Sequence, residues 1–237
     1  MAGLLPSLQT GAAHLIRLRA AGHLGWARGA VGAGLGIMAA AAITALLLGA
    51  NHAALPLLVA PVGASAVLVF AVPASPLAQP WPVIGGDLIS ALVGLAAGHL
   101  IGTPWLAGAL AVGTAIAAMS LARCLHPPGG ACALLCALGA SGPDHWGSAV
   151  MFAIAANVLS LALFGWLYNN LTGHPWPHRA VQPPRPVAAA PYAGYTRADL
   201  EAVLAEWNEV MDIDVNDLDA IYQALGRRLA RKAKPSG

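Results

Sequence analysis

His126 is the residue of this sequence best suited to chemistry, and it stands in the run CLHPPGGACALL, from Cys124 to Leu135. An imidazole has an unperturbed pKa of about 6.5, so it can bind an anion or carry a proton at neutral pH. A histidine that only caps a turn or lies at a membrane interface is the alternative. The prolines and glycines that follow His126 interrupt a long apolar stretch. Because these residues disfavour regular helix, their position here calls for a structural explanation.

A second segment has the same character. The run APVGASAVLVF starts at Ala60, and residues of the same type recur 67 positions later. The matching pairs are Pro61 with Pro128, Gly63 with Gly130, Ala64 with Ala131, Ala66 with Ala133, and Leu68 with Leu135. Ser65 stands opposite Cys132, which has a similar size. Because small residues are common in this sequence, coincidence is the alternative to an internal repeat.

Both segments predict a binding site built from helix N-termini. In each, Pro-x-Gly-Ala stops regular helix, and a short helix of about ten residues then begins inside the membrane. A helix N-terminus carries about half a positive charge and up to about four N–H groups without partners. Two such ends facing one point form an anion site without a buried lysine or arginine. The predicted site residues are Gly63, Ala64, Ser65, His126, Gly129, Gly130 and Ala131.

The cysteines near His126 suggest a metal-binding site as an alternative, which we do not favour. Thiolates and imidazoles are ligands of soft metals, but the spacing C-x-H-x5-C-x3-C of Cys124, His126, Cys132 and Cys136 matches no standard site. Cysteine also packs as a small apolar residue between helices. The sequence therefore predicts no metal and no cofactor.

Charged residues are almost absent from the middle of the chain. Between Gly29 and His178 they are Asp87, Arg123 and Asp144. We expect Asp87 to complement the dipole at the start of a helix, with proton acceptance as the alternative. Arg123 is expected to mark the cytoplasmic side rather than to attract anions at a mouth, and Asp144 to be solvated in a turn.

The elements that must hold these residues are apolar helices in a membrane. Of the 237 residues 58% are hydrophobic and only 9% are charged, which excludes an ordinary soluble domain. The expected spans are residues 30–50, 53–72, 84–101, 104–121 and 148–168, with a shorter helix at 131–140. Thr103 is expected to cap the helix that starts at Pro104, and Pro73–Pro82 to be a turn-rich connection without helix.

The predicted fold class is therefore all-α, a polytopic helical membrane protein of about six crossings. These form two inverted three-crossing repeats, each with one broken segment. Four full crossings with two segments that dip into the membrane are the alternative. Arginines before the first span (Arg17, Arg19 and Arg28) and after the last (Arg179 and Arg185) predict that both termini are cytoplasmic.

Four regions follow from this organisation. They are a cytosolic N-terminal segment (1–28), the transmembrane domain (29–170), a proline-rich linker (171–195) and a cytosolic helical hairpin (196–237). In the hairpin, Thr196 and Asp199 are expected to start one helix and an aspartate cluster to cap a second. Asp212, Asp214 and Asn216 resemble the opening of a calcium loop, but Asp217 replaces the required glycine and Gln223 the final glutamate. The basic end of the second helix is suited to anionic lipid headgroups.

The runs LHPPGGACAL and PVGASAVLVFAVPASPLAQP resemble the HPP family of integral membrane proteins, whose signature corresponds to His126, Pro127 and Pro128. The resemblance covers residues 29–168. It implies several membrane spans. Chloroplast and cyanobacterial relatives are assigned nitrite transport, so it also implies a nitrite-like solute. Some bacterial relatives carry paired CBS domains, for which this chain has no room, so nucleotide regulation through them is not expected.

Together these observations predict a secondary transporter or channel for a small anion, with nitrite as the solute suggested by the resemblance. No ATP-binding or covalent-catalysis motif is present, so an enzyme is not expected. An intramembrane cysteine or histidine enzyme and a non-transporting sensor or scaffold that signals through the tail are the rivals. The expected location is the bacterial inner membrane. The expected partners are the lipid bilayer and a small inorganic anion, with homo-oligomers compatible and nucleic acid not expected.

Overall fold

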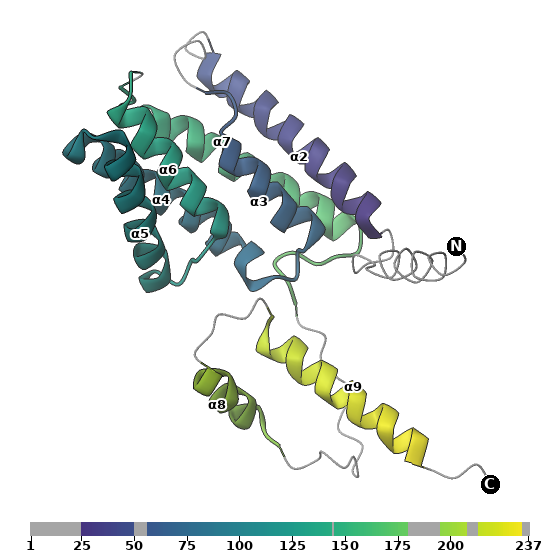
Figure 1. The fold of residues 1–237 in the computed structure, drawn as a ribbon. Helices are drawn as coiled ribbons and strands as arrows, with labels where there is room; N and C mark the ends of the chain where they lie inside the picture. Colours follow the sequence, from purple (N-terminus) through teal and green to yellow (C-terminus); the bar gives the residue numbers. More distant parts are fainter. Residues whose placement is uncertain (1–24, 50–55, 144, 180–194, 208–212, 234–237) are drawn as a thin grey trace, which may run out of the picture.

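The computed structural model describes residues 25–49, 56–143, 145–179, 195–207 and 213–233, and in these ranges every regular element is a helix. The membrane part comprises six α-helices and one 3-10 helix, followed by two α-helices of the tail (Figure 1). Their bounds are α2 Gly25–Leu48, α3 Ala60–Ala71, η2 Pro76–Ala78, α4 Pro80–Ile101, α5 Pro104–Leu121, α6 Pro127–Ser141, α7 Val150–Leu171, α8 Arg197–Trp207 and α9 Val215–Ala233. The predicted all-α class is confirmed.

Four of the described helices, α2, α4, α5 and α7, are long and apolar enough to cross a membrane. The other two, α3 and α6, have 12 and 15 residues. At about 1.5 Å per residue they are shorter than a hydrocarbon core of about 30 Å. Both begin at the predicted prolines, with Pro61 in the first turn of α3 and Pro127 and Pro128 in that of α6. The two short helices are present as predicted, but Pro-x-Gly-Ala does not stop helix: both motifs lie at the start of α3 and α6, and α6 begins at Pro127 rather than at residue 131.

Two predicted boundaries need correction. The segment Pro73–Pro82 is not free of helix, because it contains η2 and the first residues of α4. Each of these helices begins with a proline in its first turn, where a missing N–H is tolerated, and the Ser75 hydroxyl accepts the Leu77 N–H at 3.2 Å. Thr103 does precede α5, but its side chain makes no capping hydrogen bond.

The six membrane helices alternate in direction. Arg28 near the start of α2 contacts Phe70 near the end of α3 and Asn169 near the end of α7. Trp81 at the start of α4 donates to the Ala122 carbonyl just after α5, at 3.1 Å. One end of the bundle therefore holds the N-termini of α2, α4 and α6 and the C-termini of α3, α5 and α7. This alternation agrees with six traversals and with both ends of the membrane part on one side.

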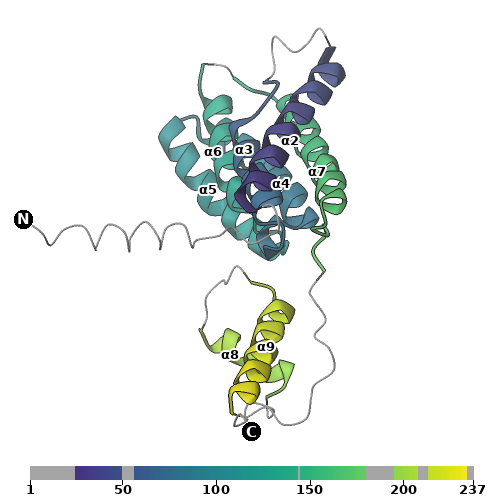
Figure 2. The same cartoon turned by 90° about the vertical axis from the view of Figure 1, so that its right-hand side faces the viewer.

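The helix pairs follow the pattern of two related three-helix units. Helix α2 packs on α3 and α7, while α5, its counterpart in the second unit, packs on α6 and α4. The short helices α3 and α6 contact each other. Figure 2 shows α5 and α6 at one side of the bundle, α2 and α7 at the other, and α3 and α4 between them. An inverted repeat predicts this arrangement.

Small residues bring α6 against α4. Gly86, Ser90, Gly94 and Gly98 recur every fourth residue and so form a stripe along α4. A Cβ on Gly94 would lie 2.3 Å from the Ala133 carbonyl oxygen of α6. A side chain at Gly94 would therefore push the two helix backbones apart.

The tail helices carry the predicted caps. The Thr196 hydroxyl and the Asp199 carboxylate bond reciprocally with each other's backbone N–H groups at the start of α8. These hydrogen bonds from Thr196 hold the pKa of Asp199 below its usual value. The Asp214 carboxylate accepts the Asn216 N–H at 2.7 Å and caps α9. Asp214 thus has a structural role, while Asp212 lies outside the described residues.

Candidate functional site

Three polar side chains meet in the apolar interior of the membrane part. The Ser65 hydroxyl lies 2.9 Å from His126 Nε2 and 3.1 Å from Asp87 Oδ2. His126 Nε2 and Asp87 Oδ2 are 3.9 Å apart. Ser65 and His126 are fully buried, and Asp87 is 1% exposed. Ionisable side chains are costly to bury inside a membrane protein, so such a pair is a candidate functional site.

Each member of the Ser65–Asp87–His126 cluster comes from a different helix. Ser65 lies in the middle of α3, Asp87 lies about two turns into α4, and His126 is the N-cap of α6. His126 has extended backbone, as a residue before proline prefers, and Pro127 then starts the helix. Gly86 admits the histidine, because a Cβ there would lie 2.5 Å from the His126 Cβ. The HPP signature and the glycine stripe therefore position the imidazole together.

The hydrogen bonds of the cluster fix where its protons can be. His126 Nδ1 lies 2.8 Å from the Leu77 carbonyl, which can only accept, so Nδ1 carries a hydrogen. In one pattern a protonated Asp87 donates to Ser65, and Ser65 donates to a neutral His126. In the other, a protonated His126 donates to Ser65, and Ser65 donates to an ionised Asp87. Between the two patterns the net change is one proton moved from Asp87 to His126, and the Ser65 hydroxyl hydrogen points to the other partner.

Two polar atoms beside the cluster have unused hydrogen-bonding capacity. Among the described residues, Asp87 Oδ1 and Ser90 Oγ are buried and have no hydrogen-bond partner. Ser90 follows Asp87 by about one helical turn, so both side chains lie on the same face of α4. A Cβ on Gly129 would lie 2.7 Å from Ser90 Oγ. Because residue 129 is a glycine, the buried Ser90 hydroxyl can lie close to the backbone of α6 without a clash.

The structure brings only some of the predicted site residues together. Ser65 and His126 are in contact, and Gly129 is buried beside Ser90. Residues Gly63, Ala64 and Ala131 are exposed, and Gly130 is half-buried. The structure does not bring these four residues to the Ser65–His126 contact, because one face of each short helix turns inward, and their part in a site stays a prediction.

The prediction that two helix N-termini face one point is wrong. The N-cap of α6 contacts Ser65, which lies about 7.5 Å along α3 from its first residue. The first two residues of α6 are prolines without N–H groups, and the Gly129 N–H donates to the His126 carbonyl at 2.9 Å. The start of α6 therefore offers fewer free amides than expected, and the polar chemistry lies in side chains.

The other short helix begins against an asparagine. The Val59 N–H, at the N-cap of α3, donates to Asn157 Oδ1 of α7 at 3.1 Å. The Asn157 amide group in turn donates to Thr44 Oγ1 at 2.8 Å and to the Leu57 carbonyl at 2.9 Å. Asn157 and Thr44 are fully buried. This N-terminus is occupied by a neutral network from α2 and α7.

Asp87 is the member of the cluster whose position in its helix the sequence analysis predicted wrongly. It is not in the first turn of α4 but deeper, where it contacts Ser65. The available signal was its position as an isolated acid within an apolar helix, which favours function over capping. Arg123 is exposed, in the loop after α5, as expected of a residue outside the core. Asp144 lies outside the described residues.

Arg28 forms a second buried polar group at the end of the bundle. Its guanidinium donates to the Phe70 carbonyl at 2.6 Å and to Asn169 Oδ1 at 2.8 Å, and Tyr168 donates to the Arg28 carbonyl at 2.9 Å. Arg28 is 4% exposed. A cation at the C-terminus of a helix is favourable, so Arg28 stabilises the junction of α2, α3 and α7.

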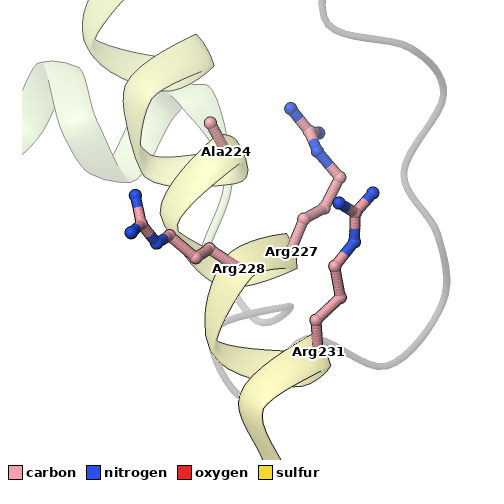
Figure 3. Close-up of a pocket in the computed structure, with 4 residues that line it drawn as sticks. All are labelled: Ala224, Arg227, Arg228 and Arg231. Atoms are coloured by element: carbon pink, nitrogen blue, oxygen red, sulfur yellow. The ribbon is translucent and has the colours of Figure 1, made fainter.

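Other candidate sites have less support. Within the described ranges no three His, Cys, Asp or Glu side chains gather in a way that would hold a metal, and the three cysteines are buried free thiols. On the tail, Arg227, Arg228 and Arg231 line an open hollow on α9 together with Ala224. Arg227 and Arg231 extend from one side of the helix and Arg228 from another (Figure 3).

Comparison with known proteins places the membrane part in a known group. The family described as "HPP, transmembrane region" matches residues 19–177. A transmembrane protein of Dictyostelium discoideum is 38% identical over 111 residues, which cover 45% of this chain and 36% of the relative. A second transmembrane protein of that organism is 37% identical over 125 residues, which cover 51% of this chain and 44% of the relative. Each match thus spans less than half of the relative. No solved structure matches significantly.

Proposed function

The chain belongs to the HPP transmembrane-region family and is an integral membrane protein, and we propose that it moves a small anion across the membrane as a secondary transporter or channel. The observation that carries this proposal is the buried Ser65–Asp87–His126 cluster. Evolution tolerates an intramembrane carboxylate and imidazole chiefly where a solute or proton passes. Nitrite is the solute that we propose on the basis of the family resemblance.

The chemistry around the cluster suits a small oxyanion. Ser90 has a hydroxyl donor without a partner among the described residues, and a protonated His126, whose ring nitrogens face Leu77 and Ser65, adds a positive charge nearby. The unpartnered Ser90 Oγ supports a position for the anion between α4 and α6. The donors are close together and few, which favours a solute of a few atoms over a large substrate.

We propose that the protein lies in the bacterial inner membrane with both termini in the cytoplasm. Arg28 and Arg123 support this orientation, because both lie at the end of the bundle where α7 ends. Arg179 follows α7 on the same side. Positive residues concentrate on the cytoplasmic side of membrane proteins. The proposal requires the lipid bilayer and the anion as partners.

The cluster contains the residue types of a hydrolase triad but not its order. In a triad, histidine lies between the nucleophilic serine and the aspartate. Here Ser65 lies between His126 and Asp87, and the other imidazole nitrogen bonds to the Leu77 carbonyl. The histidine therefore lacks the carboxylate that would orient it as a general base. We propose that the protein is not an enzyme.

One contact favours a second candidate function, a membrane sensor that signals through its tail. His178 Nε2 lies 2.8 Å from Asp217 of α9, and the His178 N–H donates to Gln79 Oε1 at 2.7 Å. His178 thus connects the start of α4 to the tail. Deletion of residues 196–237 distinguishes the candidates: a transporter keeps its flux, whereas a sensor loses its cellular phenotype while no flux is found in either form.

Uptake into proteoliposomes tests the transport proposal. Purified protein is reconstituted, and the accumulation of nitrite, nitrate and formate is measured with and without a pH gradient. We expect nitrite uptake well above that of protein-free vesicles of the same lipid composition. Uptake equal to that of the protein-free vesicles for all three anions, under both conditions, would contradict the proposal.

A further inference from the structure

The Ser65–Asp87–His126 cluster has a more specific use within the proposed function. We infer that Asp87 and His126, bridged by Ser65, bind the proton that accompanies each anion, so that the protein is an electroneutral proton–anion symporter. This inference depends on the proposed transport of an anion. It follows from the hydrogen bonds of the cluster, its burial and the charges around it.

The Ser65 hydroxyl connects the two proton acceptors. Its single hydrogen can go to His126 Nε2 or to Asp87 Oδ2, and its oxygen then accepts a hydrogen from the other partner. A proton leaves Asp87 for Ser65 Oγ as the Ser65 hydrogen passes to His126 Nε2. The O–H bonds of Asp87 and Ser65 break while a new O–H bond forms on Ser65 and an N–H bond forms on His126, and no group moves by more than a hydrogen-bond length. The reverse transfer restores the first pattern.

Besides Asp87 and His126, the buried charged side chain among the described residues is Arg28, whose guanidinium bonds to the Phe70 carbonyl and to Asn169 at the end of the bundle. Helices α3 and α5 and the η2 turn contain no ionisable side chain, and α7 has only Tyr168, at its distant C-terminal end. Helix α6 presents the thiols Cys132 and Cys136, and the remaining ionisable group of α4 is His99 in its last turn. The nearest arginine in sequence, Arg123, is exposed. Asp87 and His126 are therefore the ionisable groups in contact with Ser65, and Arg28 adds a positive charge at the junction of α2, α3 and α7.

This charge balance couples the anion to a proton. In either hydrogen-bonding pattern the pair has zero net charge. An anion that enters beside an ionised Asp87 is repelled strongly, because Coulomb forces are weakly screened in a buried site. One additional proton gives a neutral Asp87 and a cationic His126, with a net charge of about plus one. That state attracts the anion, and the occupied site is again neutral.

The unused hydrogen-bonding capacity lies where this scheme needs it. Asp87 Oδ2 faces Ser65, whereas Asp87 Oδ1 has no partner among the described residues. A proton on Oδ1 donates to the anion, and the neighbouring Ser90 hydroxyl donates a second hydrogen bond. The proton comes from water on one side of the membrane and leaves with the anion on the other. No oxidant, metal or nucleotide is required.

The test measures proton and nitrite movement in the same proteoliposomes. An internal pH dye and a nitrite assay report both fluxes while valinomycin and potassium hold the membrane potential at zero. We expect about one proton per nitrite for the natural chain, and an inward proton gradient that accelerates uptake. Asp87→Asn removes the carboxylate while it keeps the shape, so we expect any nitrite that it still moves to be unaccompanied by protons and not accelerated by the proton gradient.

The outcomes separate the inference from the proposed function. Nitrite movement without proton movement in the natural chain overturns the inference alone, whereas no nitrite movement overturns the proposed function as well. Proton flux that persists in Asp87→Asn at the natural ratio also overturns the inference. Ser120→Ala is the matched control, because Ser120 is an exposed helical serine whose hydroxyl donates to the Ile116 carbonyl at 2.8 Å. If Asp87→Asn does not fold, the ratio in the natural chain decides.

Discussion

The N-termini of α3 and α6 occupy equivalent places in the two halves of the molecule, yet their polar partners differ in kind. At the offset of 67 residues, Val59 corresponds to His126, and Asn157 corresponds to Ser90. Around Val59 the Asn157 amide accepts one hydrogen bond and donates two. Around His126, Asp87 Oδ1 and Ser90 Oγ are unpartnered among the described residues. One N-terminus is satisfied and neutral; the other is ionisable and incomplete.

This difference indicates how the two halves divide their roles. A fully hydrogen-bonded buried network stabilises one arrangement, whereas unused polar atoms leave room for a ligand or proton. Gly98 and Gly165 have the same offset, and each lies where an added Cβ would strike the facing short helix, at Ala137 of α6 and at Val69 of α3. The shared frame therefore comes from the repeat, and the chemistry comes from its divergence.

The largest effect on stability is expected at the neutral N-terminus. Asn157→Ala leaves the buried Val59 N–H and the half-buried Leu57 carbonyl without their partner. Each such group costs about 1–3 kcal/mol, so we expect a loss of about 2–5 kcal/mol in the free energy of unfolding. Denaturation in detergent measures this loss, with Asn170→Ala on the exposed side of α7 as the control. Equal effects of the two variants would show that the Asn157 network is not a structural junction.

A smaller loss is expected where α6 is pressed against α4. Gly94→Ala places a methyl group 2.3 Å from the Ala133 carbonyl, so the helices must separate, at a cost of about 1–3 kcal/mol. Gly113→Ala in α5 is the control, because its Cβ would meet nothing within 4 Å and alanine favours helix. Thermal unfolding of both variants measures the difference. A Gly94→Ala protein as stable as Gly113→Ala would mean that the stripe does not set the α4–α6 distance.

The smallest expected effect is a loss of helix stability at low pH. It should occur at the start of α8, where the cap is the charged Asp199, and not at the start of α3, where the cap is the neutral Asn157. The pKa of Asp199 at the start of α8 is lowered by hydrogen bonds from Thr196. A lowered folded-state pKa adds stability above the unfolded value of about 3.9 and loses it as pH falls through the folded value. We expect hydrogen-exchange protection of the first turn of α8, corrected for intrinsic rates, to fall below about pH 4. Protection of the Val59 amide should stay constant over that range; a parallel fall at both caps would contradict the distinction.

The sequence was sufficient for the membrane fold, and for part of the site. Hydrophobic runs and prolines predicted α2 to α7 because lipid leaves helices as the main solution for the backbone. Ser65 and His126 were found because they interrupt an apolar pattern. The repeat alone could not show which face of α3 points inward, so it could not separate the buried Ser65 from the exposed Gly63 and Ala64. Asp87 was misplaced because the start of α4 at Pro80 could not be read from a proline-rich segment.

Nitrite uptake by Ser65→Ala relative to Ser120→Ala, per folded molecule in proteoliposomes, tests the central claim most directly. Each serine hydroxyl has a carbonyl of its own helix within reach, at 3.4 Å for Ser65 and 2.8 Å for Ser120, but only Ser65 also contacts His126 and Asp87. Hydrogen bonds to charged groups contribute about 1.5–3 kcal/mol, so the account predicts uptake lower by about tenfold or more in Ser65→Ala. Equal uptake by the two variants would contradict the claim that transport chemistry takes place at this cluster.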